Sequence, residues 1–130
     1  MTTQALASEI VGAWQLVEWT TEEALAGERR HPLGLDAQGW LIYAAEGVMT
    51  VLMSGSGKSV SYAGRWWVDG QDVVHEVDVA HHPSLVGSQQ RRRVTHRGHE
   101  LILEGIERDP QGRVRTHRVS WRRGSPRTIP

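Results

Sequence analysis

Eight short segments rich in Val, Ile, Trp and Thr follow one another along the chain, and they constrain its fold more than any other feature. Turns that contain Gly or Asp connect most of them, for example Asp69-Gly70 and Arg97-Gly98. Because short turns join antiparallel neighbours, the expected topology is an up-and-down meander. The predicted strands are 12–20, 40–45, 48–53, 61–68, 73–80, 89–95, 100–106 and 114–122. We predict an all-β fold, an eight-stranded antiparallel up-and-down barrel, because closure removes the exposed sheet edges that favour aggregation.

The segments outside these strands fit a single domain that spans residues 1–130. A chain of 130 residues can bury a core without a disulfide or a structural metal. Residues 3–10 are predicted to form a short helix whose apolar face plugs the base of the barrel. Trp14 is expected to close this base together with Arg123, or with Arg122 if the register differs. Residues 21–39 form a longer connection with one helical turn or a lid, and residues 122–130 are expected to be a frayed tail.

The composition excludes several classes of function. There are no cysteines, so a disulfide framework, a cysteine zinc site and a thiol nucleophile are ruled out. Fifteen basic and fifteen acidic residues balance, which gives no overall field to attract nucleic acid or anionic membranes. His81 and His82 are adjacent on an extended chain and point apart, so we expect no metal site. We also expect no cofactor.

The expected location is the cytoplasm. The first residues show neither a cationic start nor a continuous apolar stretch, so no secretory signal is visible. No window approaches the roughly 18 apolar residues of a membrane span. Fourteen of the fifteen basic residues are Arg, and Asn and Phe are absent, a composition typical of a GC-rich bacterial genome.

A series of short motifs runs through almost the whole chain in a defined order. They are Gly12-Ala13-Trp14, Pro32-Leu33-Gly34, Gly39-Trp40-Leu41-Ile42-Tyr43, Glu46-Gly47-Val48-Met49, Val73-Val74-His75, Pro83-x-x-Val86-Gly87, Gln90 to Arg93, Gly98-x-x-Leu101-x-Leu103 and Trp121-x-Arg123. The ordered set resembles the bacterial lipocalin-like domain family, a calycin-type β-barrel. Two departures are that Trp40 stands where the family usually has Tyr and that the stretch between Met53 and Ser61 is shorter. The resemblance implies a closed barrel, but such barrels host unrelated functions.

Alternate residues of each barrel strand face the lumen, which gives a candidate site. Anchoring the first strand on Trp14 places Glu18 inside and Trp19 outside, with Trp40 and Trp67 also on the outer surface. The same alternation predicts an inward polar group bordered by aromatic rings. Its members are Glu18, His75, Arg92, Arg115 and His117, with Tyr43, Tyr62 and Trp66 around them. A slip of one residue would invert any of these assignments.

Each candidate has a functional and a structural interpretation. His75 can act as a catalytic base or bind a ligand, or it can be a hydrogen-bonded core histidine. Glu18 can be a catalytic acid or base, or a solvated residue in an ion pair. Arg92, Arg115 and His117 can clamp an anionic oxygen, or they can belong to a solvated strand face. The two tyrosines and Trp66 would shape the substrate pocket.

Three functions are compatible with these residues. The first is cofactor-independent isomerase or cyclase chemistry by proton transfer on a small, partly apolar, oxygen-bearing metabolite in the lumen. The second is non-catalytic binding or transport of such a molecule. The third is a structural or interaction module with a filled barrel. The exposed tryptophans make a homodimer a further prediction.

Overall fold

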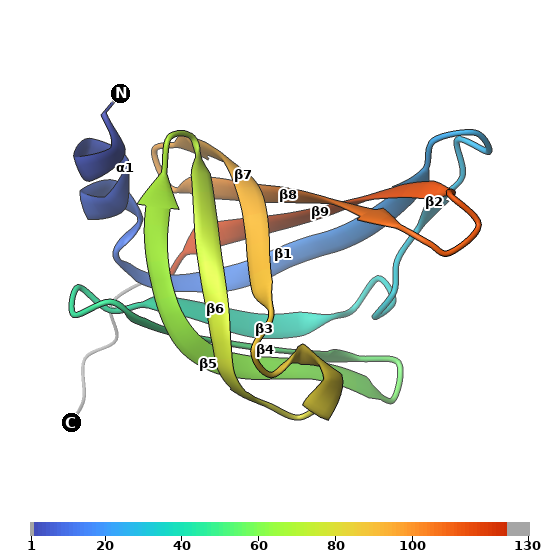
Figure 1. Cartoon of the computed structure of the whole chain (residues 1–130), viewed down its shortest axis with the longest axis horizontal. Helices are drawn as coiled ribbons and strands as arrows, with labels where there is room; N and C mark the ends of the chain where they lie inside the picture. The colour runs from blue at the N-terminus through green and yellow to red at the C-terminus, as the bar shows by residue number, and fades with distance from the viewer. Residues whose placement is uncertain (1, 125–130) are drawn as a thin grey trace.

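β1 lies beside both β3 and β9 in the computed structural model, which describes residues 2–124, and these two pairings close the barrel (Figure 1). The helical segments are α1 (Thr3–Ile10) and the short 3-10 helix η1 (Pro83–Leu85). The strands are β1 (Gly12–Glu23), β2 (Arg29–Arg30), β3 (Gln38–Tyr43), β4 (Val48–Gly55), β5 (Lys58–Asp69), β6 (Asp72–Ala80), β7 (Gln89–Arg97), β8 (Glu100–Arg108) and β9 (Val114–Arg123). From β3 to β9 each strand pairs antiparallel with the next one. The prediction of an eight-stranded up-and-down barrel is confirmed, and the two-residue β2 is an unpredicted addition that pairs with β1.

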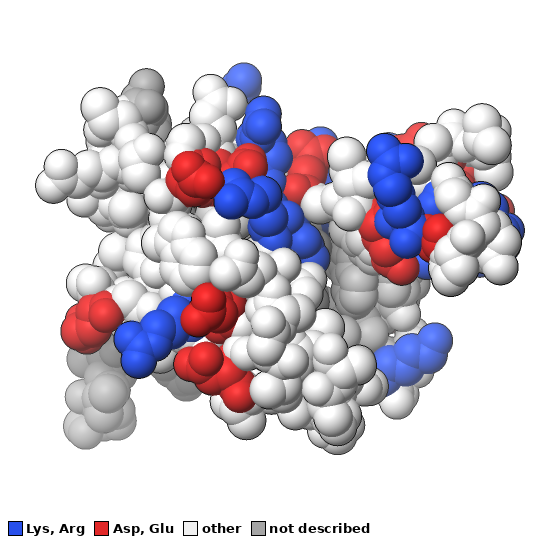
Figure 2. Space-filling model, viewed as in Figure 1, with Lys and Arg blue, Asp and Glu red and all other residues white. Residues whose placement is uncertain are grey.

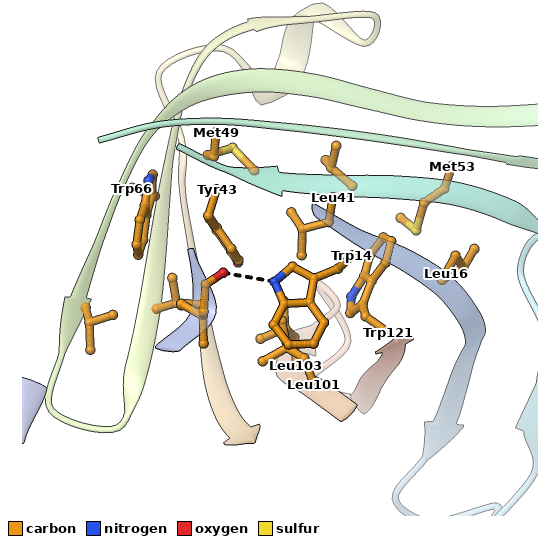
Figure 3. Close-up of a cluster of buried hydrophobic side chains, with 14 of the residues drawn as sticks. Trp14, Leu16, Leu41, Tyr43, Met49, Met53, Trp66, Leu101, Leu103 and Trp121 are labelled. Carbon is orange, nitrogen blue, oxygen red and sulfur yellow. Dashed lines mark hydrogen bonds between the residues drawn. The ribbon is translucent and has the colours of Figure 1, made fainter. Parts of the chain in front are cut away.

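The base of the barrel is closed by α1 and by two side chains that contact it. Leu6 and Ile10 of α1 are buried, as predicted for a helix that plugs the base. The indole Nε1 of Trp14 donates to the carbonyl oxygen of Ile10 at 2.9 Å, the contact drawn as a dashed line in Figure 3. The Arg123 guanidinium lies 3.9 Å from the centre of the Trp14 ring. Arg123 also donates to the carbonyl oxygens of Val11 and Glu9, at 2.7 and 2.6 Å, and so ties β9 to the end of α1.

A β-bulge in β1 overturns the orientation predicted for Glu18. Leu16 pairs with Trp121 and Glu18 with Ser120, so Val17 is an extra residue in β1. A bulge of one residue reverses the alternation for the rest of the strand. The Glu18 side chain therefore lies on the outer surface, 51% exposed, and its Oε2 is 3.4 Å from His31 Nε2. Trp19, predicted to face outward, instead lines the lumen.

The predicted tail begins too early in the chain. Arg122 and Arg123 belong to β9 and pair with Gln15 and Trp14 of β1, because closing the barrel extends the last strand to the base. Gly124 of the predicted tail donates its backbone N–H to the carbonyl oxygen of Ala13 at 2.8 Å, and residues 125–130 lie outside the described residues. The connection over 21–39 contains the end of β1, a turn at 24–26 and β2. Gly27 N–H donates to the carbonyl oxygen of Glu23 at 2.9 Å, so the turn is the predicted single helical turn.

Arg123→Met is expected to lower the free energy of unfolding by about 2 kcal/mol, because it removes a cation–π contact and two charge-assisted hydrogen bonds. Arg122→Met is the matched control, since Arg122 is the exposed neighbour in the same strand. It should change stability by less than about 0.5 kcal/mol. Urea unfolding of both variants measures the difference, and equal effects would contradict the closing role of Arg123.

Candidate functional site

The lumen contains a cavity of about 470 Å³. Its apolar wall comes mainly from inward side chains of β3, β4, β8 and β9, namely Leu41, Val51, Met53, Leu103, Val119 and Trp121. A polar wall faces them and includes Tyr62, His75, Gln90 and Arg92. The cavity adjoins a mouth of about 840 Å³, and both are lined by Trp19, Val60, His82 and His117. The mouth lies at the end of the barrel away from α1, where the β4–β5 hairpin and η1 are found (Figure 1).

Three predicted residues form one hydrogen-bonded chain, and two of them, Tyr62 and His75, belong to the polar wall. Tyr43 Oη lies 2.6 Å from His75 Nε2, and Tyr62 Oη lies 2.7 Å from His75 Nδ1. The three side chains come from inward positions of β3, β5 and β6, which the alternation predicted correctly. His75 and Tyr43 are buried, 3% and 1% exposed, whereas Tyr62 is partly buried and lines the cavity. His75 is therefore held on both sides by phenol groups.

A bulge in β6, where Asp78 is the extra residue, accompanies this arrangement. The register of β5 and β6 shifts between Ala63 and Gly64. A Cβ on Gly64 would lie 1.8 Å from the carbonyl oxygen of Glu76, so only glycine allows β6 to approach this closely. Tyr62 and His75 thus lie on neighbouring strands that a side chain at position 64 would force apart.

The three hydrogen-bonded side chains, Tyr43, His75 and Tyr62, are all uncharged at neutral pH. Burial and, to a smaller extent, the positive charge of Arg92 lower the pKa of His75 to about 3. Burial raises the pKa of Tyr62 to about 12, although Arg92 opposes the shift. Burial also raises the pKa of Tyr43 well above its ordinary value, and Tyr62 adds to this effect. These three side chains therefore interact through hydrogen bonds between neutral groups.

Arg92 lines the cavity and forms no ion pair within residues 2–124. Its guanidinium donates to the side-chain oxygen of Gln90 at 3.0 Å and to the carbonyl oxygen of Arg91 at 2.9 Å. Gly105 gives it room, because a Cβ there would lie 2.7 Å from Arg92 Nη1. Arg92 is thus a cation beside the cavity with hydrogen-bonding capacity left for a ligand.

The neighbouring arginines of β7 point outward and are paired there. Arg91 bonds to Asp69 and Asp72, and Arg93 bonds to Asp72. Figure 2 shows basic and acidic side chains lying beside one another on the visible face. The alternation predicted for these three arginines is therefore correct, and Arg92 is the one that faces the cavity.

The structure separates Arg115 and His117 from the polar wall around His75. Arg115 lies at the mouth and bonds to Glu23 at 3.3 Å. His117 Nε2 lies 2.6 Å from a carboxylate oxygen of Glu107, and His117 Nδ1 accepts a hydrogen bond from Trp19 Nε1 at 3.3 Å. Both therefore have their own carboxylate partners near the entrance, and they do not form a single clamp with Arg92.

Trp66 packs against Tyr43 outside the cavity. Its indole nitrogen donates to the carbonyl oxygen of Ala44 at 2.8 Å, and its ring packs 4.7 Å from that of Tyr43 (Figure 3). Trp66 thus holds Tyr43 in place and is not among the side chains that line the cavity.

Sequence reasoning missed several residues of the site. Trp19 was missed because no residue type around Val17 signals the bulge. His82, Leu85 and Glu107 enter the cavity wall from loops and strand ends, where no periodicity applies. The alternation of β7 does predict an inward Gln90, but not the hydrogen bond that Gln90 accepts from Arg92.

Neither a metal cluster nor a spanning helix is found in the part of the chain that the structure describes. No group of three or more His, Asp or Glu side chains within residues 2–124 is arranged to hold a metal ion. None of the helices there is long and apolar enough to cross a membrane.

A closed antiparallel barrel with an internal cavity defines a class of proteins whose architecture suggests small-molecule binding. The chain belongs to the lipocalin-like domain family, whose model matches residues 11–59 and 56–124. The match confirms the family resemblance of the ordered motifs. No curated protein matches the chain significantly.

The unfolding free energy is expected to fall as the pH drops from about 6.5 toward 3. The folded-state pKa of His75 is about 3 against an ordinary value of 6.5, so the unfolded chain takes up the proton first. The contribution of neutral His75 to the free energy of unfolding is therefore fully present above pH 6.5. Below pH 6.5 it declines by at most about 1.4 kcal/mol per pH unit. Urea unfolding between pH 7 and 4.5 measures the slope.

His75→Gln should reduce this slope, whereas His99→Gln, at an exposed histidine, should leave it unchanged. An NMR titration of the wild-type protein gives a second test. A midpoint for His75 between pH 6 and 7 would contradict the expectation.

Proposed function

We propose that the protein binds a small, partly apolar, oxygen-bearing organic molecule in the barrel lumen. The observation on which this proposal depends is the cavity of about 470 Å³ with a polar group on one wall. Its volume is within the range of about 300–1,000 Å³ that ligand sites usually have. Leu41, Val51 and Leu103 would contact the apolar part of the ligand, and the wall around Tyr62 and Arg92 would contact its oxygen.

The cavity favours this function over a structural module. A filled barrel would need bulky side chains throughout the lumen. Most of the tryptophans instead lie at the base of the barrel or on its outer surface. Trp14 and Trp121 lie toward the base, and Trp40 and Trp67 are exposed on the outer surface. The space between the base and the mouth is left for a ligand.

Val119→Trp is expected to block ligand binding, because Val119 lines the cavity and a larger ring would fill it. N-phenyl-1-naphthylamine, an apolar dye that becomes fluorescent in apolar sites, is a suitable probe. Its affinity should fall at least tenfold in the variant. Ser120→Trp adds the same ring at the adjacent, outward position and should leave the affinity unchanged. A dye that binds both variants equally, or that does not bind the wild-type protein, would contradict the proposed function.

A second candidate is isomerase or cyclase chemistry by proton transfer in the same lumen. It is favoured by Arg92, which lies beside the cavity and could stabilise a developing oxyanion, next to a hydrogen-bonded chain of three ionisable groups. With a pKa of about 3, His75 is a weak base, so its role here would be to orient Tyr62. Glu18 takes no part in this candidate, because it lies on the outer surface.

Arg92→Gln is expected to abolish most of any such activity, by about a hundredfold. The probe is the enolisable ketone 2-tetralone, whose exchange of α-hydrogen for deuterium in D₂O is followed by NMR. Arg93→Gln, which alters the outward neighbour, should keep the wild-type rate. Exchange no faster than in buffer would remove this candidate and leave the binding function standing.

Four further expectations stay predictions. They are the absence of a cofactor, a bacterial origin, a cytoplasmic location and a homodimer. The outer surface does expose Trp40 and Trp67, whereas Trp19 is turned toward the lumen.

A further inference from the structure

In the hydrogen-bonded chain Tyr43–His75–Tyr62, the number of hydrogens on each group determines which group donates and which accepts. A neutral imidazole carries one N–H, and the other ring nitrogen accepts. The burial that lowers the pKa of His75 to about 3 keeps the ring neutral. One tyrosine must therefore donate its O–H to His75, while the other accepts from His75 and keeps its own O–H for another partner.

Burial distinguishes the two tyrosines. Tyr43 is 1% exposed and does not line the cavity, and its hydroxyl has no second hydrogen-bond partner among residues 2–124. If His75 Nε2 carried the hydrogen, the O–H of Tyr43 would be a buried donor without an acceptor, which is costly. Tyr43 therefore donates to Nε2, and His75 donates from Nδ1 to Tyr62. The free O–H is then that of Tyr62, which lines the cavity.

Two other donors line the same cavity. Arg92 has no carboxylate partner within the described chain and has no acceptor atom in its side chain. Trp121 is 2% exposed, and its indole Nε1 is buried without a hydrogen-bond partner in the described structure. The carboxylate on the cavity wall, Glu107, is near the mouth and already bonded to His117. The inner cavity thus offers more donors than acceptors.

We propose that Tyr62 donates its hydroxyl hydrogen into the lumen to the carboxylate of an apolar organic acid, beside Arg92, and that Tyr43 and His75 are positioning residues that fix this direction. This inference rests on the proposed binding function and names the chemical class of its ligand. The site would select an acid over an alcohol or amine with the same carbon skeleton, because Tyr62 and Arg92 both supply hydrogens.

The direction of the chain can be measured without any ligand. Long-range ¹H–¹⁵N correlation NMR distinguishes a protonated from an unprotonated imidazole nitrogen. His75 should carry its hydrogen on Nδ1 in the wild-type protein, and Tyr43→Phe should shift the ring toward a mixture of tautomers. A hydrogen on Nε2 in the wild-type protein would overturn the inference, whether or not a ligand binds.

The ligand class is tested by displacing N-phenyl-1-naphthylamine with matched compounds. We expect 2-naphthoate to bind at least tenfold more tightly than 2-naphthalenemethanol or 2-naphthylmethylamine. Tyr62→Phe should weaken 2-naphthoate about tenfold, weaken the alcohol by less, because its oxygen is an uncharged acceptor, and leave the dye unchanged. Ser61→Ala, which removes the hydroxyl of the preceding residue, should change none of these affinities.

The outcomes separate the two proposals. If the dye binds but the acid is not preferred, the inference fails and the binding function stands. If neither the dye nor any naphthalene compound binds, the proposed function fails. Should Tyr62→Phe not fold, the preference of the wild-type protein for the acid and the tautomer of His75 still decide the inference.

Discussion

The pairing of β1 with both β3 and β9 is the interaction on which the rest of the structure depends. β1 is the first strand of the meander, and its ladder with the last strand, from Trp14–Arg123 to Glu23–Arg115, turns an open sheet into a barrel. Closure satisfies the backbone groups of both edges and encloses the lumen. The base is then held by Arg123, which contacts the Trp14 ring and the carbonyl oxygens at the end of α1. Without this closure the inward residues of different strands would not face one another.

The closed lumen has two chemically different parts. Toward α1 it is filled by buried apolar side chains such as Ile10, Trp14 and Leu101. Toward the mouth it leaves a cavity whose polar wall is made of neutral phenol and imidazole groups beside one unpaired guanidinium within the described residues. Burial lowers the pKa of His75 and raises that of Tyr62, so these groups are better suited to hydrogen bonding than to acid–base catalysis at neutral pH. These pKa shifts are the physical reason why we favour ligand binding over proton transfer as the proposed function.

The alternation of side chains explains which site residues could be predicted. Tyr43, Tyr62, His75 and Arg92 lie in regular parts of their strands, and each was correctly predicted to face inward. Glu18 and Trp19 follow a bulge, and one extra residue exchanged their faces. Arg115 and His117 face the interior as expected, but the length of β9 carries them to the mouth, where Glu23 and Glu107 bind them.

The sequence by itself determined the number and order of the eight barrel strands, the helix at the base and the side-chain alternation within regular strands. These are local properties, set by turn residues, by β-branched and aromatic runs, and by the period of two. The tertiary structure decided where the alternation breaks, how much of the lumen stays open, and which donors find acceptors. Those features depend on contacts between strands far apart in the chain, as in the meeting of Tyr43, Tyr62 and His75 from β3, β5 and β6. The direction of that hydrogen-bonded chain follows from unequal burial of its two tyrosines, which only the folded barrel sets.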